Sequence, residues 1–545
     1  MANIWNETNE MQLTRLGTMP RLAWVVHVSP EGDVKATVGD WVESGPGYLM
    51  EGAWNGDFAD SYSFMGSGVI VEPGGRVLAV APCNTTEGIY SLSGEAGTHV
   101  SNSLALLLSA SAHDLDITYL DYEADAMSIA AGLGRNVARI PLAGGAAAAV
   151  HYYCNVVVTP SGTTELPKPL PGIPVNYQEY RRFLIQQTQG VAANAADPGR
   201  RVQYPPIVFC SAGYDSAACA VLGREVGCEE AVVYESKRTS RSDAGTEVVR
   251  ALGYTTVHRK DENDYRDVGA AELFLGTGEL ATSLFFSSSA EELTGKLLIS
   301  GIWGDSMWER QFWEIESALV KAEVKLFRYV YPDTAKKEFR LKFGYINYTP
   351  AFLTAMIQQE IHLISSLPEM EPWTLHSDYD RPIVRRLAEE AGVPRDAFGM
   401  VKNGGAGTSL RFGNRSYLAR KMPPESFERF SSYLDAVKGE RRKDAKWMRR
   451  AVAYLAYVLV YLLVLHGPAV LEKWLRYDMW ATQGSWRFWY GRHTCSPFAP
   501  SLLFPWAIHE LRSTAYSGLG DLQPAMGADT SPEAADGVAA TSVDP

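Results

Sequence analysis

Hydrophobic and polar residues in the first third of the chain follow the period of β-strands. Residues 22–29 and 34–42 are apolar or alternating, and the turn-forming sequence PEGD separates them. Residues 68–72 and 76–81 repeat this pattern around the sequence PGG, and residues 150–158 form another β-branched and aromatic run. Runs of this kind, bounded by Pro, Gly and Asp, are typical of strands that are joined by hairpins. The pattern therefore predicts a strand-rich N-terminal region.

The hydrophobic period changes after a proline-rich segment at residues 166–174. This segment reads LPKPLPGIP, and proline suppresses both helices and β-ladders, so we place the first domain boundary at residue 175. Beyond it, short apolar runs alternate with segments of helical composition, which predicts βαβ units and a parallel sheet. The four expected strands are residues 206–210, 231–234, 254–257 and 297–300.

The chain divides into three regions on this pattern. At 545 residues it is too long for one ordinary core. Residues 1–175 are expected to form an α+β domain, and residues 176–516 a parallel-sheet domain that is mainly helical from about residue 349. The expected fold class is therefore α/β. Residues 517–545 are acidic, with no Lys, Arg or aromatic side chain, and are expected to form a disordered tail.

Composition and charge argue against several classes of protein. Hydrophobic residues make up 46% and charged residues 21% of the chain, which is ordinary for a globular protein. The net charge of −13 and the lack of a large basic block disfavour a nucleic-acid partner. The six cysteines form no C-x-x-C pair and the histidines show no metal-binding spacing, so we expect no zinc motif and no disulfide framework. Free thiols, and an N-terminus without the order of a signal peptide, suit a cytoplasmic protein.

One apolar segment, residues 451–465, has to be tested against a membrane span. Its sequence, AVAYLAYVLVYLLVL, is shorter than the about 20 apolar residues that a spanning helix needs. Tyr454, Tyr457 and Tyr461 lie three to four residues apart, which places them on one face of a helix. We expect a buried core helix and no membrane partner, with a shallow membrane contact as the alternative.

The expected strand at 206–210 runs into a helix through a small, hydroxylated loop. The loop consists of Ser211, Ala212, Gly213, Tyr214, Asp215 and Ser216. Backbone N–H groups at such a helix N-terminus can bind an anion, and small residues let the backbone close around phosphate oxygens. An aspartate fits a phosphate loop when a metal ion lies between the two, so Asp215 is a candidate Mg²⁺ ligand. The loop lacks the lysine of a Walker A motif, and a plain polar turn is the alternative.

Two further segments of the same region carry candidate chemistry. The expected strand at 297–300 belongs to the same predicted sheet as the strand before Asp215, and it ends in the sequence GIWGD, which contains Asp305. Residues 379–402 contain four arginines and end at Lys402. A lysine that lies where negative charge develops can stabilise a transition state strongly. A second polar turn and a solvated lysine are the alternatives.

These three segments resemble the asparagine synthetase family of N-type ATP pyrophosphatases. The first is similar to the SGGxDS pyrophosphate loop of that family, the second to its SGxGxDE loop, and the third to its C-terminal lysine segment. The resemblance implies a domain that uses ATP and Mg²⁺ and releases AMP and pyrophosphate. It assigns ATP or pyrophosphate binding to Ser211, Ala212, Gly213, Tyr214, Asp215, Ser216 and Gly301, the metal to Asp215 and Asp305, and catalysis to Lys402. Adenine would be held by backbone near residues 234–236.

The N-terminal region resembles the glutaminase domain of the same family. That Ntn-type domain uses a cysteine at the N-terminus of the mature chain, whereas residue 2 here is Ala and the first cysteine is Cys83. A nucleophile whose own α-amine is the base cannot be supplied from position 83. We therefore expect a degenerate, structural domain. The amine would come from free ammonia, a second substrate or the substrate itself, as in the related β-lactam synthetases and lasso-peptide cyclases.

The resemblance implies an amide-forming ligase of specialised metabolism or peptide modification. Its partners would be a small-molecule or peptide carboxylate and an amine, and a homodimer is a compatible assembly. Ile302 stands where the family has a glutamate that handles the proton of the amine, and Ser306 stands where a second acid follows Asp305. Either another acid, for which Glu309 is a candidate, takes that proton, or the amine arrives deprotonated. The alternatives are a non-catalytic nucleotide- or partner-binding relative and a sulfur- or RNA-modifying ATP pyrophosphatase. The latter usually needs a reactive cysteine pair or a basic face.

Overall fold

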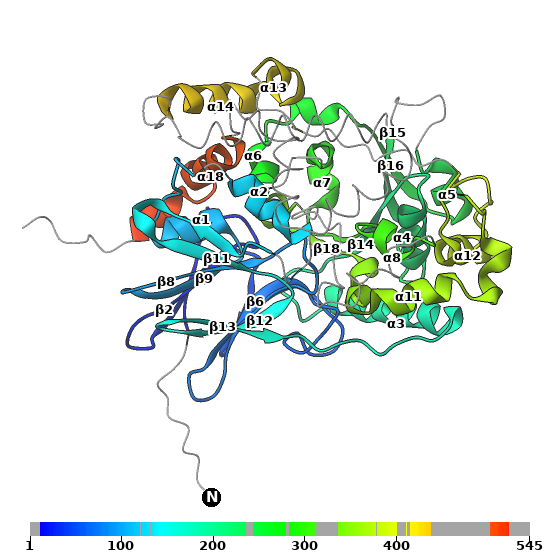
Figure 1. Cartoon of the computed structure of the whole chain (residues 1–545), viewed down its shortest axis with the longest axis horizontal. Helices are drawn as coiled ribbons and strands as arrows, with labels where there is room; N and C mark the ends of the chain where they lie inside the picture. The colour runs from blue at the N-terminus through cyan, green and yellow to red at the C-terminus, as the bar shows by residue number, and fades with distance from the viewer. Residues whose placement is uncertain are drawn as a thin grey trace, which may run out of the picture.

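The computed structural model describes the chain at residues 11–119, 121–130, 133, 136–235, 244–278, 283–310, 336–377, 379–400, 410, 415–437 and 502–522. Two mainly antiparallel sheets come first in the chain, and a parallel sheet with flanking helices follows them (Figure 1). The fold is therefore mixed α/β with strand-rich N-terminal sheets, as the hydrophobic pattern predicts.

The two N-terminal sheets pack face to face. The first has the order β1 (Gln12–Arg15), β3 (Val34–Val38), β2 (Trp24–Val28), β9 (Gly97–Ser101), β8 (Ile89–Gly94), β11 (Ala147–His151) and β10 (Arg139–Pro141). The second has the order β13 (Gly162–Pro167), β12 (Cys154–Thr159), β7 (Val77–Val80), β6 (Met65–Val71), β5 (Tyr48–Ala53) and β4 (Glu43–Gly45). Both predicted hairpins are present, as the antiparallel pairs β2–β3 and β6–β7. Buried Val26, Val69 and Val156 come from both sheets and share one core.

The third sheet is parallel and has its topological switch point beside its central strand. Its order is β16 (Thr256–Asp261), β15 (Glu230–Glu235), β14 (Pro206–Cys210), β17 (Leu297–Ile299) and β18 (Ile346–Tyr348). The chain moves outward from β14 to β16 and then returns to the other side of β14 for β17. Ligands of open α/β sheets bind beyond the carboxyl ends of the strands at such a point.

The predicted strands of this sheet are confirmed, with two corrections. The strand expected at 254–257 begins later, at Thr256. The strand β18 was not predicted, because its three residues INY carry no recognisable apolar period. It pairs with β17 and completes the sheet.

Helices pack on the parallel sheet and link it to the N-terminal sheets. Those used below are α1 (Leu104–Ala110), α3 (Tyr177–Ala195), α4 (Tyr214–Arg224), α6 (Glu272–Leu275), α8 (Gly304–Met307), α10 (Lys337–Phe343), α12 (Pro382–Glu390) and α18 (Leu503–Thr514). The late helix α18 lies against both α1 and α6 (Figure 1). Helix α18, from the C-terminal part of the chain, therefore packs against a helix of the N-terminal region and a helix of the parallel-sheet region.

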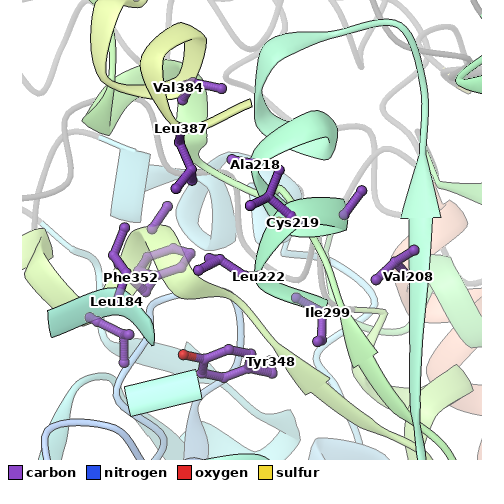
Figure 2. Packing of buried hydrophobic residues seen from close by; sticks show 14 of the residues in the cluster. Leu184, Val208, Ala218, Cys219, Leu222, Ile299, Tyr348, Phe352, Val384 and Leu387 are labelled. Carbon is purple, nitrogen blue, oxygen red and sulfur yellow. The ribbon is translucent and has the colours of Figure 1, made fainter. Parts of the chain in front are cut away.

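The helix α4 lies very close to the sheet. Figure 2 shows Ala218 and Leu222 of α4 in the cluster that also contains Val208 of β14. A Cβ atom on Gly223 would lie 2.7 Å from Cγ1 of Val208, which is too close for a side chain. Small residues on α4 thus fix the distance between the helix and the strand that precedes it.

Two predictions concern the C-terminal part of the chain. The apolar segment 451–465 lies outside the described residues, and no helix among the described ones is both long and apolar enough to cross a bilayer. Residues 517–522, expected to belong to the tail, form the 3-10 helix η9 (Ser517–Leu522), in which Leu519 is buried. The packing of Leu519 makes the predicted start of the tail too early, and residues 523–545 lie outside the described part.

Candidate functional site

The loop after β14 is folded by its own hydroxyl groups. Ser216 Oγ lies 2.8 Å from Ser211 Oγ and accepts a hydrogen bond of 3.0 Å from the Ser211 N–H. Ser211 Oγ also accepts from the Gly213 N–H at 3.2 Å. Gly213 has an extended backbone and no side chain that could cap α4, which begins at the next residue. The loop thus turns tightly into a helix N-terminus of the kind that binds anions.

The loop after β17 packs directly against Asp215. A Cβ atom on Gly301 would lie 2.7 Å from the backbone carbon of Asp215, and one on Gly304 would lie 2.6 Å from its Oδ1. Both distances are too short for any residue with a side chain. Trp303 has a φ of 68°, a left-handed conformation that is unusual for a bulky residue. Asp305 follows this contact directly, so the two acidic loops meet as the parallel topology predicts.

A buried arginine joins the carboxylates of both loops. Arg381 is 1% exposed, and its Nη1 donates to Asp215 Oδ1 at 2.5 Å while its Nε donates to Glu309 Oε2 at 3.4 Å. Burial alone would lower the pKa of Arg381, but the carboxylates of Asp215, Asp305 and Glu309 raise it above its ordinary value. The side chains of Asp215 and Glu309 are 24% and 17% exposed, so the cluster is open to solvent on one side.

The helix α12 and the turn after it hold the first loop from another side. Arg385 donates to the Tyr214 hydroxyl from Nη2 at 2.6 Å and from Nε at 3.1 Å. Burial raises the pKa of Tyr214, despite this contact with a guanidinium. The Gly399 N–H donates to the Ala212 carbonyl at 2.8 Å. The Tyr214 side chain therefore holds the loop in place. If Tyr214 contacts phosphate as expected, the contact would come from its backbone.

Most of the site residues predicted from the sequence lie close together in the structure, and Lys402 lies outside the described residues. The first loop, Gly301 and Asp305 lie together at the switch point. Lys402 lies outside the described residues, so its expected role stays a prediction. The described chain reaches Met400, directly after the contact between Gly399 and Ala212. The described part of this segment therefore ends beside the first loop.

Of residues 234–236, which are expected to hold adenine, Tyr234 is a buried tyrosine, and residue 236 lies outside the described part of the chain. Tyr234 lies near the carboxyl end of β15, and its hydroxyl is 2.6 Å from Ser289 Oγ and donates to the Phe285 carbonyl at 3.1 Å. Its ring packs edge-on against Phe209 of β14, at 5.6 Å between centroids. These contacts fix the Tyr234 side chain in the protein, and any contact with adenine would have to come from its backbone.

Sequence reasoning missed the two arginines that organise the site. Arg381 and Arg385 both lie in the segment 379–402, but only Lys402 was singled out there. One signal was available: Arg381 directly precedes Pro382, which begins α12, and Arg385 follows one helical turn later. Two arginines at that spacing lie on one face of a helix, and here that face turns toward the first loop.

The residues of the cluster fit a metal-bound anion. Asp215, Asp305 and Glu309 supply carboxylate oxygens, the ligands that Mg²⁺ prefers, beside a helix N-terminus that favours negative charge. Arg381 supplies the positive charge that balances these carboxylates in the present arrangement. A cation at Asp215 would have to share that carboxylate with the guanidinium or displace it.

No family model and no curated protein matches the chain. The functional conclusion therefore rests on the geometry of this site and on the three segments that compose it.

Proposed function

We propose that this chain is an ATP-dependent ligase that forms an amide bond and releases AMP and pyrophosphate. It adenylates a substrate carboxylate, which an amine then attacks. The observation that carries the proposal is the contact of Asp215 with Gly301 and Gly304, beside the buried guanidinium of Arg381. Two acidic loops held this tightly at the switch point of a parallel sheet are suited to a metal-bound phosphate chain.

The proposal gives each part of the cluster a task. Asp215 and Asp305 would hold Mg²⁺, which when bound neutralises phosphate charge and orients the nucleotide. The first loop and the N-terminus of α4 would bind pyrophosphate oxygens. Lys402 would stabilise the negative charge that develops at the reacting carboxyl group. Glu309, which pairs with Arg381 at 3.4 Å, would accept the proton of the amine in place of the acid missing at Ile302.

The N-terminal sheets support an amine that does not come from glutamine. Cys83 is fully buried, and its Sγ donates to the Ser61 carbonyl at 3.0 Å. Burial raises the pKa of this thiol, so it stays protonated and is not a nucleophile. We infer that the region is a degenerate, Ntn-type glutaminase-like domain with a structural role. The amine would then be ammonia, a second substrate or part of the carboxylate substrate.

A non-catalytic relative is the second candidate, and one observation favours it. Arg381 already pairs with the carboxylate that would bind the metal, at 2.5 Å. A protein that binds no metal would keep such a pair, because a buried arginine needs a compensating charge. A partner-binding relative differs from the ligase in whether Mg²⁺ and a nucleotide can take the place of this ion pair, whereas a nucleotide-binding relative differs from it only in turnover.

The deciding experiment is calorimetric titration with a non-hydrolysable α,β-methylene ATP analogue, with and without Mg²⁺. We expect Mg²⁺-dependent binding by the wild type and at least about tenfold weaker binding by Asp215→Asn, because a metal ligand is lost. The matched control is Asp267→Asn, which removes an exposed carboxylate of the same region. A wild type that does not bind would favour the non-catalytic relative, and an Asp215→Asn variant that binds normally would contradict the assigned role.

A turnover assay extends the test to the other residues. Asp305→Asn and Lys402→Ala should each abolish pyrophosphate release during a search of carboxylates and amines, without loss of folded structure. Either variant with wild-type turnover would contradict the role assigned to that residue.

A further inference from the structure

A second group of ligand-type side chains lies in the N-terminal sheets, and it is independent of the proposed function. His151 is the last residue of β11 in the first sheet, and Cys154 is the first residue of β12 in the second. Two residues carry the chain from one sheet to the other, and Tyr153 has a left-handed φ of 54° there. Glu165 is supplied by β13, which pairs with β12. The crossing between the sheets thus brings three different donor types together.

The three donors are close enough to share one ion. His151 Nδ1 lies 2.7 Å from Glu165 Oε1, and the imidazole nitrogen, the Cys154 sulfur and the carboxylate oxygen all lie within 4.8 Å of one another. Among the described residues, this is the group of three His, Cys, Asp or Glu donors that meets this spacing. A tetrahedral zinc ion with bonds of about 2.0–2.3 Å places its ligand atoms about 3.3–3.8 Å apart. Shifts of about an ångström would therefore suffice.

The surroundings of His151 are those of a metal ligand. Ser91 is buried on β8, and its Oγ lies 2.8 Å from His151 Nε2, the ring nitrogen that does not face Glu165. Histidines that bind metals nearly always donate the N–H of their second ring nitrogen to a carboxylate, a backbone carbonyl or water, and the Ser91 hydroxyl can accept such a bond and fix the orientation of the ring. The contact to Ser91 leaves Nδ1 directed at Glu165 and toward the position between the three donors.

Charge and access are compatible with a divalent cation at this position. A metal ion deprotonates a coordinating thiol. A thiolate and a carboxylate would balance the two charges of a divalent cation. The Glu165 side chain is 57% exposed, so an ion could enter from solvent.

We propose that His151, Cys154 and Glu165 form a zinc site that ties the two N-terminal sheets together. A nitrogen, a thiolate sulfur and a carboxylate oxygen are the donor types that select Zn²⁺ over Mg²⁺ or Ca²⁺, and solvent supplies the fourth ligand. The competing explanation is a metal-free network in which Ser91, His151, Glu165 and Cys154 bond only to one another. The two explanations make opposite predictions for zinc binding.

The test uses the full chain, first freed of metal by a chelator and then titrated with Zn²⁺ against a chromophoric chelator. We expect one zinc ion per chain, and affinity that falls at least about tenfold in Cys154→Ser and in Glu165→Gln. Cys228→Ser is the matched control, because that buried thiol lies in the parallel-sheet region and bonds to the Pro206 carbonyl. Co²⁺ added instead of zinc should give a thiolate charge-transfer band that Cys154→Ser alone abolishes.

Folding is followed in the same samples by thermal unfolding with and without Zn²⁺. Zinc should raise the unfolding temperature of the wild type and of Cys228→Ser, and should raise that of Glu165→Gln much less. The Glu165 side chain is exposed, so we expect Glu165→Gln to fold normally. If Cys154→Ser does not fold, Glu165→Gln decides. A wild type that takes up no zinc, or variants that bind it with unchanged affinity, would overturn the proposal in favour of the metal-free network.

Discussion

Two buried arginines of this chain are each surrounded by carboxylates, but their surroundings differ. Arg340 of α10 is 2% exposed, and its partners Glu51, in β5, and Glu87, just before β8, are buried as well. Arg381 is 1% exposed, but the side chain of its partner Asp215 is 24% exposed. The first cluster is closed on every side, whereas the second is open to solvent. The first is built to hold two regions together, and the second is able to exchange partners.

The hydrogen bonds of the two clusters support this distinction. Arg340 binds Glu51 through Nη1 at 2.6 Å and Nη2 at 3.0 Å, and it binds Glu87 through Nε at 2.9 Å and Nη2 at 2.7 Å. Both contacts are bidentate, which is the strongest arrangement that a guanidinium can make. Arg381 makes one short contact, to Asp215, and a longer one to Glu309. Its guanidinium is therefore held less completely.

The largest expected effect is the loss of the closed cluster. Arg340→Met leaves Glu51 and Glu87 buried without their shared cation and should reduce the free energy of unfolding by about 3–5 kcal/mol. Chemical denaturation measures this loss. The triple variant Arg340→Met, Glu51→Gln, Glu87→Gln should recover part of the stability, because no buried charge then lacks a partner. A loss below about 1 kcal/mol in the single variant would mean that the cluster contributes little to holding the two regions together.

The second effect concerns the frame around the open cluster. Gly301→Ala would place a Cβ 2.7 Å from the backbone of Asp215, and such overpacking should cost about 1–3 kcal/mol of unfolding free energy. The control is Gly94→Ala, because a Cβ at Gly94 has no atom within 4 Å. If Gly301→Ala is as stable as the control, the two acidic loops do not pack as tightly as the structure indicates.

The third effect separates the two arginines directly. Arg381→Met should lower the free energy of unfolding by only about 1–2 kcal/mol, because its partner carboxylates reach water and are not left in a closed, apolar setting. The same variant should bind the Mg²⁺–nucleotide analogue differently from the wild type, since the charge beside Asp215 has changed. A loss of stability equal to that of Arg340→Met would mean that the Arg381 cluster, like the Arg340 cluster, serves mainly to stabilise the fold.

Local patterns were enough to predict the frame of the candidate site. The alternation of apolar residues predicted the hairpins, and the alternation of strands and helices predicted the parallel sheet. From these it followed that the loop containing Asp215 and the loop containing Asp305 end at one edge of the sheet, and the structure places them in contact. Each of these inferences uses residues that are neighbours in the sequence. The metal-binding roles given to the two aspartates and the catalytic role given to Lys402 stay predictions.

The charged clusters could not be predicted, because their members are far apart in the sequence. Arg340 is 289 residues from Glu51 and 253 from Glu87, and no periodicity relates such positions. The absence of a zinc motif in the sequence is a related case. His151 and Cys154 are three residues apart in the sequence, and Glu165 reaches them because β13 pairs with β12. This combination is not one of the usual spacings of zinc ligands, so the sequence did not predict a site here.

The smallest effect comes from a carboxylate next to the closed cluster. Glu338 is buried on α10 and accepts hydrogen bonds from Ser103 Oγ at 2.6 Å and from the Tyr516 hydroxyl at 2.7 Å. Burial raises the pKa of Glu338 above its ordinary value of 4.5, against the effect of these bonds. The amide of glutamine can accept from one hydroxyl and donate to the oxygen of the other, so Glu338→Gln should change the unfolding free energy at neutral pH by less than about 1 kcal/mol.

The informative measurement on Glu338→Gln is its pH dependence. In the wild type, the folded state keeps the Glu338 proton above pH 4.5, where the unfolded state has lost it, so this group contributes stability that decreases as pH rises through the raised pKa. Glu338→Gln lacks this titration. Denaturation at a series of pH values from 4.5 to neutrality should therefore show the variant gaining stability relative to the wild type as pH increases. A constant difference would mean that Glu338 is ionised in the folded protein over the whole range, and that α10 carries a further buried charge beside Arg340.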